Sequence, residues 1–245
     1  MDKALYIAMS GAKQNMYAQR AHSNNLANVN TAGFKEDFAQ ARAMSVYGEH
    51  FPSRAYSMTE RPATRFEQGP LQETGNALDI ALKGEGWIAV QSPDGEQAFT
   101  RAGDLQIDVN GFLRTGSGLE VLGEGGPIVV PPSAGVEIGV DGAISVIPLG
   151  GEAAVVQIDR IRLVNPDPAN MEKRGDGLMY VKDGIEPPLD ETIRVESGFL
   201  EGSNVNAVSA LTEILTLSRQ YELQVKLMSQ ADQNSEASAR LLQFS

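Results

Sequence analysis

The chain has 245 residues, and 42% of them are hydrophobic, which is enough for one or two domains with a sizeable core. It carries 20 basic and 32 acidic side chains, a net charge of −12, which argues against binding to a phosphate backbone. Cysteine is absent, which excludes disulfides, thiol catalysis and thiolate metal sites. The sequence has no apolar run long enough to span a membrane and no signal-peptide pattern, so we expect neither direct membrane insertion nor Sec-type export.

Charge, proline and glycine divide the chain into three parts. Residues 46–199 hold 12 basic and 24 acidic side chains, so this middle part alone accounts for the net charge. All 12 prolines and all but three of the 25 glycines also lie there. Because proline and glycine interrupt helices, this distribution predicts helical ends and a middle part of strands and turns.

The first part, residues 1–34, is predicted to be a helix of an inner assembly domain. Its residues Leu5, Met9, Ala12 and Met16 recur at steps of four and three, which places them on one helical face. Small residues on such a face allow close approach of another helix, although they contribute little burial energy.

A segment rich in asparagine, residues 23–35, follows this helical pattern. Four of its asparagines fall within seven positions, and Gly33 can close a helix C-terminus. Asparagine hydrogen-bonds nearby peptide groups and tolerates left-handed backbone, so the segment predicts a helix end with a fixed turn. An additional hydrogen-bonding role between subunits would explain why the turn is so strongly specified.

Residues 35–75 show a weak pattern and contain Pro52, Pro62 and Pro70, which predicts an extended connection. Residues 76–200 are predicted to form a β-rich outer domain with mostly antiparallel strands. The strand-like runs are Leu78–Leu82, Trp87–Gln91, Ala98–Arg101, Leu105–Asp108, Phe112–Thr115, Leu119–Leu122, Ile128–Val130, Ala143–Ile147, Val155–Val164 and Leu178–Lys182. The turns between them are expected at Gly95, Gly111, Gly142 and Gly184, each of which follows an asparagine or aspartate.

The last part, residues 201–245, is predicted to be the second helix of the inner assembly domain. Positions at alternating steps of four and three run through five heptads, and most of them are apolar: Ala207, Leu211, Ile214, Ser218, Tyr221, Val225, Met228, Asp232, Ser235, Ala239 and Leu242. The pattern indicates a coiled-coil-like seam on a helix of roughly 54 Å. The whole chain is therefore predicted to be an α+β protein in which two long terminal helices pack together and a β domain lies between them in sequence.

The sequence offers no convincing catalytic, cofactor or metal site. His22 and His50 are the only histidines, and neither has an obvious carboxylate or serine partner. Asp108 and Gly111 resemble part of a calcium loop, but the first and last ligand positions are not acidic, so a hairpin turn is the better interpretation. Asp104 and Asp108 share one strand face as a hydrolase pair does, which keeps a β-rich cell-wall hydrolase as an alternative function.

Three blocks of sequence resemble the flagellar rod and hook family. The first is Asn24-Asn25-Leu26-Ala27-Asn28 with Thr31, Gly33, Phe34 and Lys35, and the second is the run from Ala77 to Trp87 with Phe99 to Gly103. The third is the run from Gly198 to Asn206, followed by Arg219 to Glu222 in the terminal helix. The opening residues Met1 to Ala12 are most similar to a proximal rod protein, while a distal rod or hook protein of the same family is the alternative.

The resemblance implies a structural subunit of the proximal rod of the basal body, with no enzymatic activity and no cofactor. Such a subunit would assemble through its terminal helices into a tubular drive shaft that crosses the periplasm, transmits torque and encloses the export channel. The implied partners are proximal and distal rod subunits, copies of the chain itself and the flagellar type III export apparatus. The residues expected at the assembly interface are Leu5, Met9, Ala12, Met16, Asn24, Asn25, Leu26, Asn28, Gly33, Phe34, Ser203, Asn204, Val205, Leu211, Ile214, Tyr221, Val225, Met228 and Leu242.

Overall fold

A computed structural model describes residues 2–38, 41–46, 54–59, 63–148, 155–182, 184 and 186–243. The chain forms two compact units. The helical unit consists of Met1–Asn28, Glu36–Arg65 and Val205–Ser245, and the β unit consists of Val29–Lys35 and Phe66–Asn204. The predicted α+β class, with a helix near each end and mostly antiparallel strands, is confirmed.

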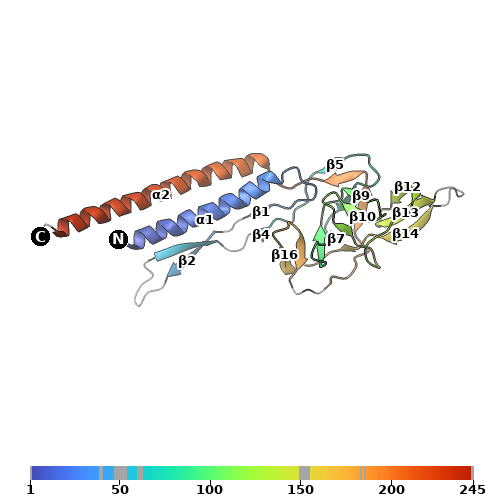
Figure 1. The fold of residues 1–245 in the computed structure, drawn as a ribbon, viewed down its shortest axis with the longest axis horizontal. Coiled ribbons are helices and arrows are strands. Elements are labelled where there is room, and N and C mark those ends of the chain that lie inside the picture. Colours follow the sequence, from blue (N-terminus) through green and yellow to red (C-terminus); the bar gives the residue numbers. More distant parts are fainter. Residues whose placement is uncertain are drawn as a thin grey trace. The chain divides into compact units, whose positions relative to one another are not determined.

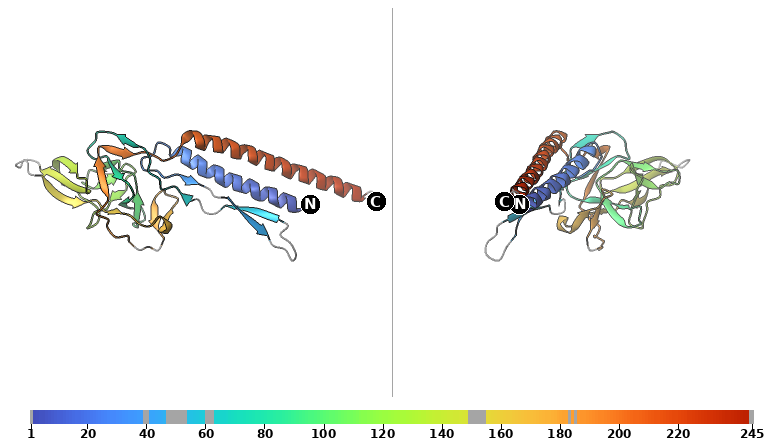
Figure 2. Two further views of the ribbon diagram at one scale, coloured as in Figure 1. Left: turned by 180° about the vertical axis from the view of Figure 1, so that it is seen from behind. Right: turned by 60° about the vertical axis from the view of Figure 1, so that its left-hand side comes forward.

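Two long helices dominate the helical unit. Helix α1 spans Asp2–Ala27 and helix α2 spans Ala207–Gln243, with 26 and 37 residues. They lie side by side and run in opposite directions (Figures 1 and 2). At about 1.5 Å per residue α2 is roughly 16 Å longer than α1, so it reaches past the start of α1. In the described residues, neither helix has the apolar length that a membrane crossing requires.

The face of α2 that packs against α1 is marked by its less exposed positions. Along the part of α2 that faces α1, these recur at steps of four and three: Ala210, Ile214, Leu217, Tyr221, Gln224, Met228 and Ala231. On α1 the matching face carries small residues, including the buried Ala8 and Ala12. A Cβ atom added at Gly11 would lie 2.5 Å from the side-chain amide of Gln224, so glycine allows the close approach of the helices there.

Short strands complete the helical unit in the segment where the sequence predicted only an extended connection. Strand β1 (Asp37–Phe38) pairs with β4 (Ala63–Thr64), and β2 (Ala41–Val46) pairs with β3 (Arg54–Thr59) in a six-residue antiparallel register. Both β1 and β3 contact α1. The hairpin was missed because its two strands lack the regular alternation of apolar and polar residues from which strands are predicted.

The described residues of the β unit form four sheets, and all the strand pairings within these sheets are antiparallel. The largest has the strand order β16-β17-β8-β7-β11-β10-β9, with β15 also paired to β7, and a second has the order β12-β13-β14. The two remaining sheets pair β18 with β6 and β19 with β5. The strand bounds are β5 Leu71–Glu73, β6 Ile80–Lys83, β7 Trp87–Gln91, β8 Gln97–Thr100, β9 Leu105–Ile107, β10 Leu113–Thr115, β11 Glu120–Val121, β12 Ser133–Ile138, β13 Ala143–Pro148, β14 Val156–Arg160, β15 Leu163–Val164, β16 Met171–Lys173, β17 Met179–Val181, β18 Arg194–Ser197 and β19 Phe199–Glu201, and a short 3₁₀ helix spans Pro168–Asn170.

The core of the β unit lies on both faces of β7. Ile88 and Val90 join one apolar cluster, and Trp87 and Ala89 join another, in which the ring of Phe66 meets the Trp87 ring edge to face at 5.9 Å. A strand that is covered on both sides has no polar face, which explains the continuous apolar run in its sequence.

Most of the strands predicted in the middle part are present, and the predicted turns at Gly95, Gly111, Gly142 and Gly184 all have positive φ. The predicted strand Val155–Val164 is instead two strands, because the chain leaves one sheet and joins another near Ile161: β14 pairs with β13, and β15 pairs with β7. Strands β5, β12, β16, β18 and β19 were not predicted, because their sequences are short or polar. Strands β12 and β16 pair with the next strand along the chain, whereas β18 and β19 are held by the distant strands β6 and β5.

Candidate assembly interface

The family signature at the end of α1 continues into a segment that belongs to the β unit. We call this segment, Val29–Lys35, the strap. Its Gly33 has a φ of 67° and donates its N–H to the carbonyl of Glu201 at 2.7 Å. A Cβ atom at Gly33 would lie 2.2 Å from the backbone carbon of Arg101. Glycine is required here both by the backbone conformation and by the close contact.

The strap is joined to the other end of the β unit by a buried cluster of charges. The Glu201 carboxylate accepts hydrogen bonds from Lys35 Nζ at 2.6 Å, from Arg101 Nη1 at 2.9 Å and from the Gly69 N–H at 3.1 Å. The three charged side chains are at most 4% exposed. Burial has the largest effect on the pKa of Lys35 and lowers it, while the bond to Glu201 acts in the opposite direction. We call Lys35, Arg101 and Glu201 the clasp.

Further bonds hold the strap. Lys173 Nζ donates to the carbonyl of Lys35 at 2.8 Å and lies 3.8 Å from the centre of the Phe34 ring. The backbone N–H of Asn204 donates to the Phe34 carbonyl, and the Asn204 side-chain amide donates to the carbonyl of Glu67. Gly33, Phe34 and Asn204 of the predicted interface therefore meet inside the β unit of a single chain.

Asn25 has a separate role within the helical unit. Its side chain is fully buried, donates to the Asp37 carbonyl at 2.6 Å and accepts from the Asp37 N–H at 2.9 Å. Because the Asn25 side chain bonds to both backbone groups of Asp37, it connects the end of α1 to strand β1. Asn28 continues the helix end, where its side chain donates to the carbonyl of Asn24. Bonds within one chain therefore account for two of the four asparagines of this segment, Asn25 and Asn28.

The remaining predicted interface residues fall into three groups by exposure. Met9, Met16, Asn24, Leu211 and Val225 are exposed; Leu5, Leu26, Ile214, Tyr221 and Met228 are partly exposed; and Ala12, Ser203 and Val205 are buried. The side chain of Leu242 lies outside the described residues. The predicted seam on α2 combines partly exposed positions such as Ile214 with exposed positions such as Leu211. Its coiled-coil-like packing stays a prediction.

The outer faces of the two helices carry more apolar surface than was predicted. On α2 the exposed apolar residues also include Val208, Leu215, Leu223 and Leu227, with exposed fractions from 54% to 76%. On α1 they include Tyr6, Ile7 and Tyr17. We call these residues, together with Met9, Met16, Leu211 and Val225, the outer stripes. Large apolar side chains that remain exposed along a helix mark a surface for interaction with another protein.

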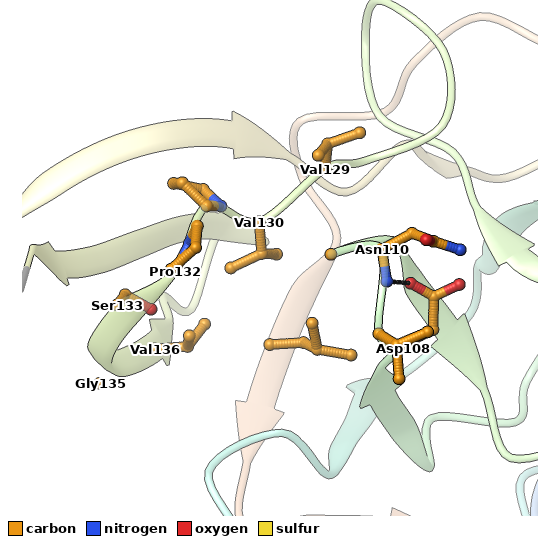
Figure 3. Close-up of a pocket in the computed structure, with 12 residues that line it drawn as sticks. Asp108, Asn110, Val129, Val130, Pro132, Ser133, Gly135 and Val136 are labelled. Carbon is orange, nitrogen blue, oxygen red and sulfur yellow. Dashed lines mark hydrogen bonds between the residues drawn. The ribbon is translucent and has the colours of Figure 1, made fainter.

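An open groove in the β unit includes Asp108, one of the two acidic residues that the sequence suggested as a hydrolase pair. It has a volume of about 420 Å³ and is lined mainly by apolar residues between the β9–β10 turn and β12 (Figure 3). At its edge, Asp108 accepts from the N–H groups of Asn110 and Phe112 and is paired with Arg114 at 3.0 Å. The Asp108 carboxylate thus organises a hairpin turn, as the sequence analysis favoured.

Chemical groups suited to catalysis do not converge in the described part of the chain. Asp104 and Asp108 have different neighbours: burial raises the pKa of Asp104, with Asp79 adding to the effect, whereas Asp108 is bound to Arg114. The described residues also contain no group of three or more histidine, aspartate or glutamate side chains placed to hold a metal ion.

Three family descriptions match the chain, at its two ends and in the β unit. Residues 5–35 match the family described as flagella basal body rod protein, and residues 81–146 match the D1 domain of the flagellar hook protein FlgE/F/G. Residues 196–241 match the C-terminal region of the flagellar basal body rod FlgEFG protein. The strap lies within the match at residues 5–35, and Glu201 lies within the match at residues 196–241. The clasp therefore joins segments that match different family models.

Relatives that align with the whole chain belong to the same class of protein. The chain is 38% identical to the flagellar basal-body rod protein FlgF of Escherichia coli and 35% identical to that of Salmonella typhimurium, with all of each chain covered. It is 30% identical to FlgG of Bacillus subtilis over 95% of its length and 96% of the relative's. The chain belongs to the family of flagellar basal-body rod proteins. It is a structural subunit of the basal body of the FlgF type and not an enzyme.

Proposed function

We propose that this rod subunit assembles through the outer stripes of α1 and α2, which pack in a coiled-coil-like manner against the helices of neighbouring subunits. The supporting observation is the exposure of large apolar side chains along both helices, as at Met16, Leu215 and Leu227. Neighbours that repeat the same contact head to tail would form an open helical tube, the symmetry that a drive shaft around a channel needs.

The distribution of charge supports assembly through the helical unit. This unit has 10 basic and 9 acidic side chains, a net charge of +1, whereas the β unit has 10 basic and 23 acidic, a net charge of −13. Copies of the helical unit can pack closely with little electrostatic cost. Closely packed β units would repel each other, which favours their placement where solvent and salt screen the charge.

The partners of this assembly would be other rod subunits, proximal and distal, and copies of the chain itself. We further propose that the chain reaches the rod, across the periplasm, through the flagellar type III export apparatus, and that the assembled helices transmit torque. The names of the relatives in Escherichia coli and Bacillus subtilis, both basal-body rod proteins, support the rod as the place of assembly.

The test is the double substitution Leu211→Glu and Leu215→Glu. Both side chains are exposed, so we expect the stability of the purified chain to change by less than about 0.5 kcal/mol. Swimming should be lost when the variant is the only copy in cells, and isolated basal bodies should lack a complete rod. A matched control is Val109→Glu, because Val109 is fully exposed in the β unit. Normal swimming of the double variant would show that this stripe is not an interface.

A further inference from the structure

We propose that the strap and the clasp form a latch, which opens and closes separately from the core of the β unit and whose closing residue is Glu201. The latch is a conformational device within one chain. It does not depend on how subunits pack in the rod.

The first argument is the nature of the contacts that hold the strap. The larger apolar side chains of the strap, Val29 and Phe34, are both only partly buried. Its other contacts are polar: the Gly33 N–H with Glu201, the Lys35 amine with Glu201 and Glu67, and the Lys35 carbonyl with Lys173. A segment with little apolar burial opens at a lower free energy than core strands do.

The second argument is the charge balance of the clasp. Glu201 is the acceptor for two buried cations, and Lys35 is separated from it by 166 residues of sequence. Without the carboxylate, closing the strap would bury the Lys35 ammonium beside Arg101 with no counter-ion. Unpaired buried charge is strongly unfavourable, so the closed strap is stable only when the Glu201 carboxylate is in place.

The third argument is topological. Glu201 is the last residue of β19, which pairs with β5, and the preceding strand β18 pairs with β6. The pairing of these last strands with the first strands of the β unit therefore also positions the carboxylate that closes the latch. The closed latch holds Phe34 beside Asn204, seven residues after the end of α1 and three before the start of α2. Closing thus brings together the chain segments that lead to the two terminal helices.

Hydrogen exchange of two backbone amides in the full chain tests the latch. The Gly33 amide reports on the strap through its bond to Glu201, and the Ala89 amide reports on the core through its bond to Arg162. In Glu201→Gln we expect Gly33 to exchange at least about tenfold faster while Ala89 changes much less, because only the strap is released. The matched control is Glu196→Gln, which removes a partly exposed ion pair with Lys83 from the neighbouring strand β18 and should leave both amides unchanged.

Two results would overturn the proposal. One is unchanged protection of Gly33 in Glu201→Gln. The other is an equal acceleration at Gly33 and Ala89, which would make Glu201 a general stabilising residue. If the variant does not fold, the unmodified chain gives the answer in increasing urea: Gly33 should exchange through an opening with a weaker urea dependence than that of Ala89, and equal dependences would exclude a separate latch.

Discussion

Gly33 is the residue on which the strap depends most directly. Its φ of 67° and its contact with the Arg101 backbone are separate constraints, and Gly75 provides a comparison because it has a φ of 71° and open space where a Cβ would lie. For Gly75→Ala we expect a loss of about 1 kcal/mol from backbone strain alone. For Gly33→Ala we expect more than about 3 kcal/mol, because the methyl group must also displace backbone atoms. Urea unfolding of both variants measures the difference, and equal losses would contradict the steric argument.

Asp104 predicts a stability change with pH. Burial raises its pKa in the folded state, so the ionised group destabilises the fold; the carboxyl's favourable contribution is complete below its unfolded pKa, about 4, and is lost as the pH rises through the folded pKa. The stability of Asp104→Asn relative to the unmodified chain should therefore increase as the pH is raised from about 3 to about 7. Urea unfolding at both pH values measures this gain.

Asp190 serves as the control with the opposite sign. Hydrogen bonds from the Thr192 side chain and backbone lower its pKa, so its contribution is present above the unfolded pKa and is lost as the pH falls through the folded pKa. Asp190→Asn should be less stable than the unmodified chain at pH 7 and approach it in acid. The same trend for both substitutions would show that net charge, and not the local environment, decides the result.

The pairing of the two helices predicts a substitution and its rescue. At Gly11 a larger side chain meets Gln224, so Gly11→Leu should force the helices apart and lower stability by about 1 to 3 kcal/mol. Adding Gln224→Ala should restore part of the loss by making room. Thermal unfolding followed by circular dichroism measures both, with Met16→Leu on the exposed face as a control that should have no effect. A Gly11→Leu chain as stable as the unmodified one would mean that the helices do not pack closely there.

The helices and many strands could be predicted because their signals are local. The apolar step in α2 and the glycine turns of the β unit repeat over a few residues, and each determines the structure of its own segment. Strands such as β18 and β19 could not be predicted in this way. They are only three or four residues long and each carries a glutamate, and they are strands because β6 and β5 pair with them from more than 100 residues away.

The same limit applies to the candidate site. The sequence placed Gly33, Phe34 and Asn204 at the assembly interface, and their contacts within one chain were not predicted. Their contacts between subunits stay a prediction. Glu201 was noted only as part of a resemblance. Its pairing with Lys35 and Arg101 joins three distant segments, and no local spacing indicates such a cluster. The available signal was the position of Glu201, which directly follows Phe199 and Leu200 shortly before the predicted C-terminal helix.

At the scale of the whole molecule, the chain enters and leaves the β unit through segments that are bound to each other. Phe34 and Asn204 are directly hydrogen-bonded, and the side chains that hold the strap beside them are those of Arg101, Lys173 and Glu201. Insertion, deletion or replacement elsewhere in the β unit would therefore leave the anchoring of the chain ends intact. Recombination during evolution could therefore change the size and shape of the β unit, while helices α1 and α2 keep the residues through which they pack.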